Sequence, residues 1–208
     1  MLIDLTHVIR NGLPVFPGDD ETVLAHTRQF DRDFYNNHQL STNMHAGTHI
    51  DGPMHLLDVH RPISGIPLDT FVGEGCLLNV CGQETIDYKE EYEELIREGQ
   101  IVILHTGHGK RFGQPGYFTD YPVLTDAFAG LLVKKRVKMV GLDTPSPDKE
   151  PYSVHKTLLG GQILIIENLA NVDKLADAGA PFEIIALPLL IEADSSVARV
   201  IARIKDRA

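Results

Sequence analysis

Residues 45–55 read HAGTHIDGPMH and hold three of the ten histidines in this chain of 208 residues. His45 and His49 are four residues apart, which is the spacing of helical zinc motifs. Gly47 and the glycine–proline pair that follows Asp51 disfavour a helix here. We therefore expect an extended segment, in which the odd-numbered residues from His45 to Asp51 share one face.

A flat strand would keep the two histidines apart. Residues four apart in a strand are separated by about 13 Å, at roughly 3.3 Å per residue. Two imidazoles cannot then reach one ion, because metal–nitrogen distances are about 2.0–2.1 Å. The segment must bend, and Gly47 is the natural place for the bend. We also expect that its missing side chain leaves room for an ion between His45 and His49.

The residue types in this segment point to a catalytic metal. Two neutral imidazoles and one carboxylate suit Zn²⁺, Mn²⁺ or Fe²⁺. Three protein ligands leave coordination positions open, which is typical of catalytic and not of structural sites. His55 has two possible roles: a fourth ligand, or a free base beside a metal-activated water. Spacing alone leaves both roles open.

The rest of the chain alternates strands with helices, which predicts an α/β domain with a mixed sheet. It contains neither a GxGxxG motif nor a P-loop, so a nucleotide-binding fold is not expected. Thr125 and Ser153 are the predicted N-caps of two helices, and 197–204 is predicted to lie near the sheet edge. The expected strands are 2–6, 75–80, 101–105, 137–142, 162–167, 182–187 and 197–204, and the expected helices are 88–97, 125–135, 153–160 and 172–178.

Charge and composition exclude several classes of protein. The formal net charge of −10 argues against nucleic acid or an anionic membrane as the main partner, since both attract basic surfaces. No apolar run approaches the roughly 18 residues of a membrane helix, and no secretory signal is visible. Cys76 and Cys81 are expected to be small buried hydrophobes in a strand, which favours a reducing cytoplasm.

The pattern HxGTHxDxPxH at His45–His55 resembles the signature of the cyclase-like metal-dependent hydrolases. That family includes the bacterial kynurenine formamidases and the isatin hydrolases. The resemblance extends to PVFPGD at residues 14–19, to GLDTPS at 141–146, and to His155 and Glu167. It implies one cyclase-like domain over residues 1–208, of the swivelling β/β/α type with a mixed sheet.

The resemblance also implies the ligands of two ions, most simply Zn²⁺ with Mn²⁺ as the alternative. His45, His49 and Asp51 match the family's ligands to the first ion, and Asp51 would bridge to the second. His155 and Glu167 match the family's second-site histidine and bridging glutamate. Glu167 also ends an apolar run, where an unpartnered charge is costly to bury.

Two further positions concern catalysis and substrate. His55 matches the family's catalytic acid/base. Phe16 stands where kynurenine formamidases usually carry tryptophan, in the loop that lines the aromatic substrate pocket. Phenylalanine still offers an aromatic face for stacking, so we expect Phe16 to bind substrate.

These inferences predict a metal-dependent amide hydrolase of arylformamidase type. It would convert N-formylkynurenine and water to kynurenine and formate, a step of tryptophan catabolism, as a cytoplasmic homodimer or larger homo-oligomer. The same site could instead open a cyclic amide or a lactone, or catalyse a ring-forming reaction. Two alternatives from other classes are a non-haem iron oxygenase and a metal-binding protein without catalysis.

Overall fold

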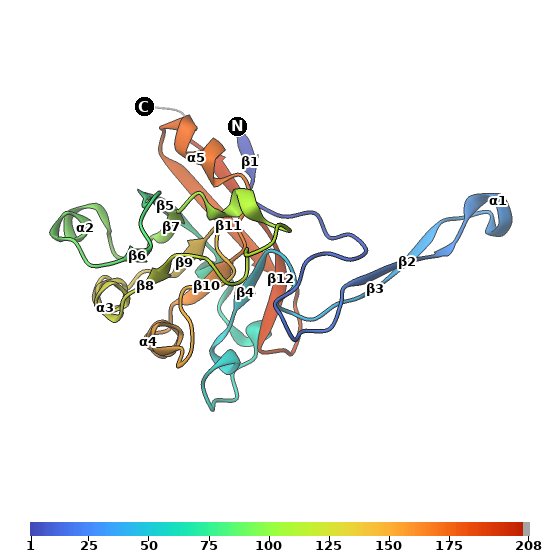
Figure 1. Ribbon diagram of the computed structural model, residues 1–208, viewed down its shortest axis with the longest axis horizontal. Helices are drawn as coiled ribbons and strands as arrows, with labels where there is room; N and C mark the ends of the chain where they lie inside the picture. Colours follow the sequence, from blue (N-terminus) through green and yellow to red (C-terminus); the bar gives the residue numbers. More distant parts are fainter. Residues whose placement is uncertain (206–208) are drawn as a thin grey trace.

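The computed structural model describes residues 1–205. Seven of its strands pair in a closed order and form a barrel, and Figure 1 shows their arrangement. Because β12 pairs with β11 along one side and with β4 along the other, the sheet has no gap between its first and last barrel strands. In barrel order the strands are β12 (Ser195–Ile204), β11 (Phe182–Pro188), β5 (Val72–Asn79), β7 (Ile101–His105), β9 (Met139–Leu142), β10 (Leu164–Glu167) and β4 (His49–Asp51).

The barrel is mixed, as the alternating pattern predicts. β5, β7, β9 and β10 run parallel to one another, and the remaining barrel pairs are antiparallel. β1 (Leu2–Asp4) pairs with the second half of β12, on the side that β4 occupies along the first half. The segment 197–204, predicted near a sheet edge, is thus the neighbour of the short edge strand β1. Closing the barrel requires this long strand to have neighbours on both sides.

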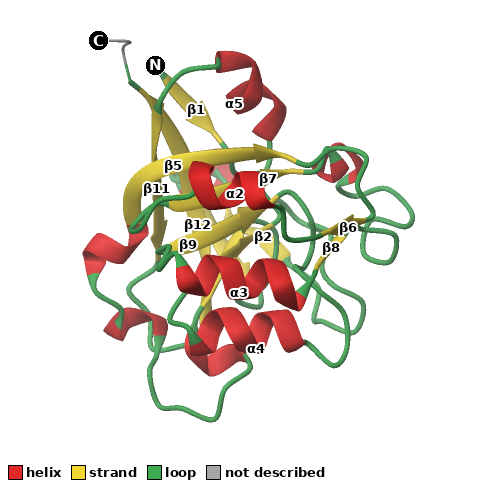
Figure 2. Cartoon of the chain, turned by 90° about the vertical axis from the view of Figure 1, so that its left-hand side faces the viewer, coloured by secondary structure: helices red, strands yellow, loops and turns green. Residues whose placement is uncertain are grey.

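The helices at residues 90–95, 126–134 and 153–160 cover one outer face of the barrel (Figure 2). The Thr125 hydroxyl caps α3 by accepting from the N–H of Phe128, as predicted. The helices are α1 (Phe30–Asp33), α2 (Glu90–Leu95), α3 (Asp126–Lys134), α4 (Ser153–Gly160) and α5 (Val172–Ala178). Shorter elements are the 3₁₀ turns Pro53–His55, Ile63–Gly65, Leu68–Phe71 and His108–Arg111, and the paired strands β6 (Thr85–Ile86) and β8 (Val123–Leu124).

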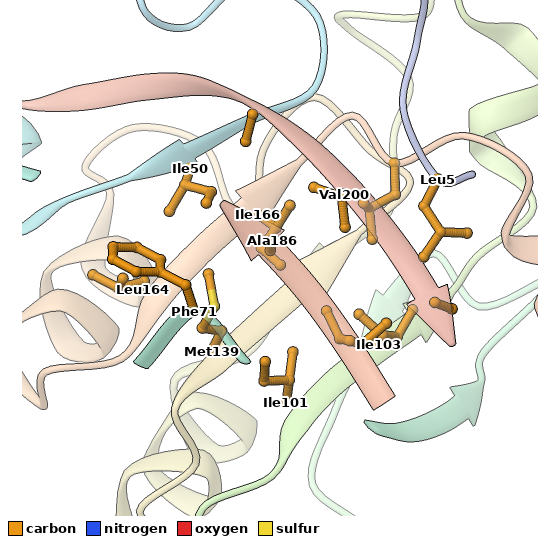
Figure 3. Packing of buried hydrophobic residues seen from close by; sticks show 14 of the residues in the cluster. Leu5, Ile50, Phe71, Ile101, Ile103, Met139, Leu164, Ile166, Ala186 and Val200 are labelled. Atoms are coloured by element: carbon orange, nitrogen blue, oxygen red, sulfur yellow. The ribbon is translucent and has the colours of Figure 1, made fainter. Parts of the chain in front are cut away.

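Two hydrophobic cores follow from the period-2 alternation of the parallel strands. In β7, Ile101 and Ile103 belong to the core inside the barrel, which Figure 3 shows with Met139, Ile166 and Val200. Their neighbours on the same strand, Val102 and Leu104, belong to the second core, which includes buried residues of α2, α3 and α4. Strands buried on both faces read as continuous apolar runs, as these do in the sequence.

A hairpin projects from the barrel (Figure 1). It consists of β2 (Val23–Arg28), the short helix α1 at its tip, and β3 (Asn37–Ser41). Every residue of β3 is exposed, and the tip exposes Phe30 and Phe34, the latter by 83%. This hairpin was not predicted from the sequence.

The two cysteines differ from the expectation. Cys76 lies in β5 and is half-buried, whereas Cys81 lies beyond the end of that strand and is exposed. Both thiols are free, and burial raises the pKa of each. Across residues 1–205, no helix is both long enough and apolar enough to cross a membrane.

Candidate metal centre

The segment 45–55 bends at Gly47, as predicted. Gly47 has φ +63°, a conformation that glycine adopts without strain, and β4 begins two residues later at His49. A Cβ at this glycine would lie 2.9 Å from Cδ2 of Leu13. The missing side chain therefore leaves room for Leu13, and the expectation that it leaves room for an ion is wrong.

Three side chains of this segment meet around one point. Nδ1 of His45 lies 2.9 Å from Oδ1 of Asp51, and Nε2 of His49 lies 3.4 Å from the same oxygen. Asp51 and His49 are buried, and His45 is about one-quarter exposed. This is the cluster expected from the spacing, with one ligand atom of each residue within 4.8 Å of the others.

A second group lies directly beside the first and shares Asp51 with it. The other oxygen of Asp51, Oδ2, lies 3.7 Å from Nε2 of His155, and Oε1 of Glu167 lies 3.3 Å from that nitrogen. Oε2 of Glu167 is 3.3 Å from Nε2 of His49. Both carboxylates thus reach from one group to the other.

The fold explains why distant residues meet here. β4 and β10 are antiparallel neighbours, and their register sets Glu167 opposite His49. α4 precedes β10 in the chain and brings His155 to the same end of that strand. The five predicted ligands come from two strands, one helix and one turn, and the structure brings all five together.

Several of these contacts are too long for hydrogen bonds but suit ligands of a common ion. Two ligand atoms that are each about 2.1 Å from a tetrahedral ion lie about 3.4 Å apart. Nε2 of His49, Oδ2 of Asp51 and Oε1 of Glu167 are buried and have no hydrogen-bond partner among the described residues. Buried polar atoms normally have partners, so three converging atoms without one fit a metal site. The donor set is of the kind that Zn²⁺ and Mn²⁺ bind.

Each histidine also has an acceptor on the ring nitrogen that faces away from this cluster. Nδ1 of His49 is 2.8 Å from the carbonyl oxygen of Gly47. Nδ1 of His155 is 2.5 Å from Oδ1 of Asp148, and Nε2 of His45 is 2.8 Å from Oδ2 of Asp194. Such acceptors fix the tautomer that presents a lone pair to a metal.

The carboxylates of Asp148 and Asp194 were not predicted from the sequence. Asp148 also accepts from the backbone N–H groups of Val154 and His155, at 2.8 and 3.3 Å, and so caps α4. The predicted cap, Ser153, is instead the first residue of the helix and makes no capping hydrogen bond. Asp194 is 139 positions or more from every residue of the signature, and nothing in its neighbourhood marks it as part of the site.

Carboxylates dominate the electrostatics of the site. Burial lowers the pKa of His45, but hydrogen bonds to Asp194 and Asp51 outweigh this effect and raise it to about 9. In the same way, burial is outweighed at His49, where Asp51 and Glu167 raise the pKa to about 10. The pKa of Asp194 is lowered, chiefly by its hydrogen bond with His45. The site therefore attracts positive charge, whether carried by protons or by a metal ion.

His55 lies at the edge of the cluster, beside a pocket of about 220 Å³. One of its ring nitrogens is within 4.8 Å of ligand atoms of Asp51 and His155, and its side chain is 29% exposed. Phe16 and Phe118 form part of the pocket wall, with their rings edge to face and centroids 5.7 Å apart. Phe118 was not predicted. The pocket thus places an aromatic wall next to the cluster of candidate metal ligands.

Comparison with known proteins agrees with this geometry. Residues 3–149 match the model of the family described as "Putative cyclase". Proteins named kynurenine formamidase from Bacillus cereus and from Bacillus thuringiensis are each 30% identical to this chain over 210 residues. Those alignments cover 97% of this chain and 96% of the relative.

Solved structures share the fold over the whole chain. Isatin hydrolase A from Labrenzia aggregata superposes with a TM-score of 0.84 at 24% identity, covering 99% of this chain and 94% of that one. A structure described as a potential metal-dependent hydrolase with cyclase activity gives 0.81 at 25% identity, covering 100% and 99%. Since the family model covers most of the chain and the relatives span nearly all of it, the chain belongs to the cyclase family of metal-dependent hydrolases.

Proposed function

We propose that this protein is a metal-dependent amide hydrolase of arylformamidase type, which converts N-formylkynurenine and water to kynurenine and formate. One observation carries the proposal: five ligand side chains form two adjacent groups that share Asp51, directly beside an aromatic pocket. The full-length relatives named kynurenine formamidase support the substrate class. We propose that residues 1–208 act as one hydrolase domain.

We propose that the site holds two divalent ions, Zn²⁺ or alternatively Mn²⁺. His45, His49 and Asp51 would hold one ion, and His155, Glu167 and the second oxygen of Asp51 would hold the other. A bound divalent ion supplies Lewis acidity, which polarises a carbonyl and lowers the pKa of water toward neutrality. The convergence of buried, unpartnered ligand atoms from both groups supports this assignment.

His55 is proposed as the catalytic acid/base. Hydrolysis adds the oxygen of water to the formyl carbon and breaks the carbon–nitrogen bond, so that formate and an amine are released. The amine is a poor leaving group until its nitrogen is protonated. His55 lines the pocket next to the ligand cluster, where it can take up a proton from water and deliver it to that nitrogen.

Phe16 and Phe118 are proposed to bind the aromatic ring of the substrate. Their edge-to-face arrangement leaves apolar surface toward the pocket, and aromatic contacts of this kind are each worth about 0.5–1.5 kcal/mol. Leu56, Pro145 and Tyr152 add to the apolar lining. Phenylalanine at position 16, in place of tryptophan, therefore keeps an aryl substrate feasible.

A homodimer or larger homo-oligomer is proposed for the working enzyme. A two-stranded hairpin is only marginally stable by itself, and this one projects with its strands and its aromatic tip exposed. A second copy of the chain could cover Phe30, Phe34 and Tyr35, which are each more than half exposed. Two free thiols are consistent with the proposed cytoplasmic location.

The experiment that tests the function is hydrolysis of N-formylkynurenine by purified protein, stripped of metal and then reloaded with Zn²⁺ or Mn²⁺. We expect activity only after reloading. His55→Ala should lose at least about 100-fold in kcat while still binding metal, since general acid–base catalysis contributes about 10²–10⁴-fold. His60→Ala is the matched control, because His60 is exposed and lies outside the pocket lining.

A cyclic aromatic amide is the second candidate substrate, because the compact aromatic pocket and the metal cluster would suit ring opening equally well. Turnover of isatin or of a lactone, with none on N-formylkynurenine, would favour this alternative. Oxygen consumption by the iron-loaded protein would instead point to an oxygenase. Tight metal binding without turnover of any of these compounds would point to a metal-binding protein.

A further inference from the structure

Asp194 brings a carboxylate from the far end of the chain to two histidines of the site. Its Oδ2 lies 2.8 Å from Nε2 of His45 and 3.6 Å from Nδ1 of His55. The two imidazole rings lie side by side, with centroids 4.2 Å apart. One oxygen therefore faces both the proposed metal ligand and the proposed acid/base.

The backbone around Asp194 is held firmly against the signature segment. The N–H of Gly52 donates to the carbonyl oxygen of Asp194 at 3.0 Å, and the N–H of Ile63 donates to that of Ala193 at 2.9 Å. The next residue, Ser195, starts β12 and pairs with Asp51 in β4. The side chain of Asp194 is 37% exposed. Its backbone, however, is held by hydrogen bonds at the residues before and after it.

The orientation of His45 as a metal ligand requires a hydrogen-bond acceptor next to its Nε2. Its Nδ1 lies beside Oδ1 of Asp51, where the proposed ion would bind. When Nδ1 binds an ion, the proton of the neutral ring is on Nε2. Asp194 accepts from Nε2 in the same way that Gly47 and Asp148 accept from the other two histidine ligands. Such partners typically contribute 10–100-fold in metal affinity or activity.

We propose that Asp194 is a positioning residue that aligns His45 as a metal ligand and His55 as the proton donor through one carboxylate oxygen. At 3.6 Å, the contact to His55 is longer than a hydrogen bond. Catalytic hydrogen bonds often shorten when substrate binds. The proposal rests on the proposed hydrolase function for the role of His55, but not for the role of His45.

The first test measures metal binding without any substrate. Zn²⁺ and Co²⁺ affinities are compared by calorimetry and by the visible spectrum of bound Co²⁺, for wild type, Asp194→Asn and Asp194→Ala. We expect affinity for one ion to fall about 10–100-fold, with the larger loss for alanine, which removes the acceptor altogether. Glu192→Gln is the control: it removes one exposed negative charge two residues away and should leave affinity unchanged.

Two results of this test would overturn the role at His45. Unchanged metal affinity and an unchanged Co²⁺ spectrum would mean that Asp194 does not orient the ligand. A drop of one whole ion per chain at saturating metal would mean that Asp194 is itself a ligand and not a positioning residue. Thermal unfolding of each variant checks that the fold is intact.

The second test compares two substrates that differ in their leaving group, and both are measured at saturating metal. N-formylkynurenine needs protonation of its departing amine, whereas p-nitrophenyl formate releases a stable phenolate. We expect Asp194→Asn to lower kcat for the amide at least 10-fold more than for the ester, with little change in KM. Equal losses on both would overturn the role at His55. If wild type hydrolyses neither compound, the proposed function fails, and the metal test still decides the role at His45.

Discussion

At the scale of single residues, the site depends on side chains that serve two partners at once. Asp51 turns one carboxylate oxygen to His45 and His49 and the other to His155. Its pKa is lowered well below the ordinary range: burial would raise it, but the surrounding histidines outweigh that effect. A buried carboxylate that stays charged in this way is suited to bridging two cations.

Asp51→Asn tests the bridging role. We expect it to lose affinity for both ions and at least about 100-fold in activity, because an amide offers one neutral oxygen where the carboxylate offers two charged ones. Metal content after dialysis and kcat on N-formylkynurenine measure the effect. Asp69→Asn, at an exposed position, is the control. Loss of only one ion in the Asp51 variant would contradict the bridge.

Gly52 shows how closely the backbone packs behind the site. A Cβ there would lie 2.5 Å from the carbonyl oxygen of Asp194, which cannot move without disturbing β12. We expect Gly52→Ala to lower the free energy of unfolding by about 1–3 kcal/mol, as overpacking does. Gly65→Ala meets nothing within 4 Å and should change it by less than about 0.5 kcal/mol. Urea unfolding compares the two, and equal effects would contradict the steric explanation.

At the scale of elements, the site depends on how the helix that carries His155 begins. α3 begins at a hydroxyl cap, whereas α4 begins at the carboxylate of Asp148, which also holds the ring of His155. One aspartate thus sets the start of the helix and the orientation of a proposed metal ligand on it. This explains why α4, although short, can hold His155 in a defined position.

The two helix starts predict different effects of removing a hydroxyl. Thr125→Ala should lower the free energy of unfolding by about 1 kcal/mol, since it removes an N-cap hydrogen bond. Ser153→Ala should change it by less than about 0.5 kcal/mol, because Ser153 makes no capping bond. Urea unfolding at one pH measures both. A larger loss in the Ser153 variant would mean that this residue, and not Asp148, caps α4.

At the scale of the whole molecule, the strand that closes the barrel also carries residues of the proposed metal site. β4 lies between β10 and β12, so the strand that carries His49 and Asp51 also completes the barrel. Bound metal would join β4, β10 and α4, three elements that are distant in the sequence. Metal binding should therefore stabilise the complete fold and not only the site.

Removal of metal tests this link. A ligand at about 1,000 times its Kd stabilises the folded state by about 4 kcal/mol, so chelation should lower the Tm. The pKa values of His45 and His49, about 9 and about 10, exceed the ordinary 6.5. Their protonation stabilises the metal-free protein fully below pH 6.5, and this contribution is lost as the pH rises toward 9–10.

The Tm difference between loaded and stripped protein should therefore widen as the pH rises from 6.5 to 9. Metal affinity should rise in parallel, because binding displaces protons from the histidines. Differential scanning calorimetry at several pH values measures the first effect, and calorimetric titration in two buffers measures proton release. A Tm difference that is constant with pH would contradict this linkage.

By itself, the sequence determined the local chemistry and most of the elements. The signature predicted the bend at Gly47 and the cluster of His45, His49 and Asp51, since residues so close in the chain can meet through one local turn. Apolar runs predicted the parallel strands because strands buried on both faces have no polar alternation. The family resemblance, and not spacing, added His155 and Glu167.

Only the tertiary structure decided which distant residues complete the site. Asp148 and Asp194 reach their histidines across 7 and 149 positions, and Phe118 meets Phe16 across the pocket. The closed barrel, the exposed hairpin and the exposure of Cys81 also depend on packing between separate segments. Local patterns report the conformation of a segment, whereas the neighbours of a side chain are set by strand pairing and packing among residues far apart in the sequence.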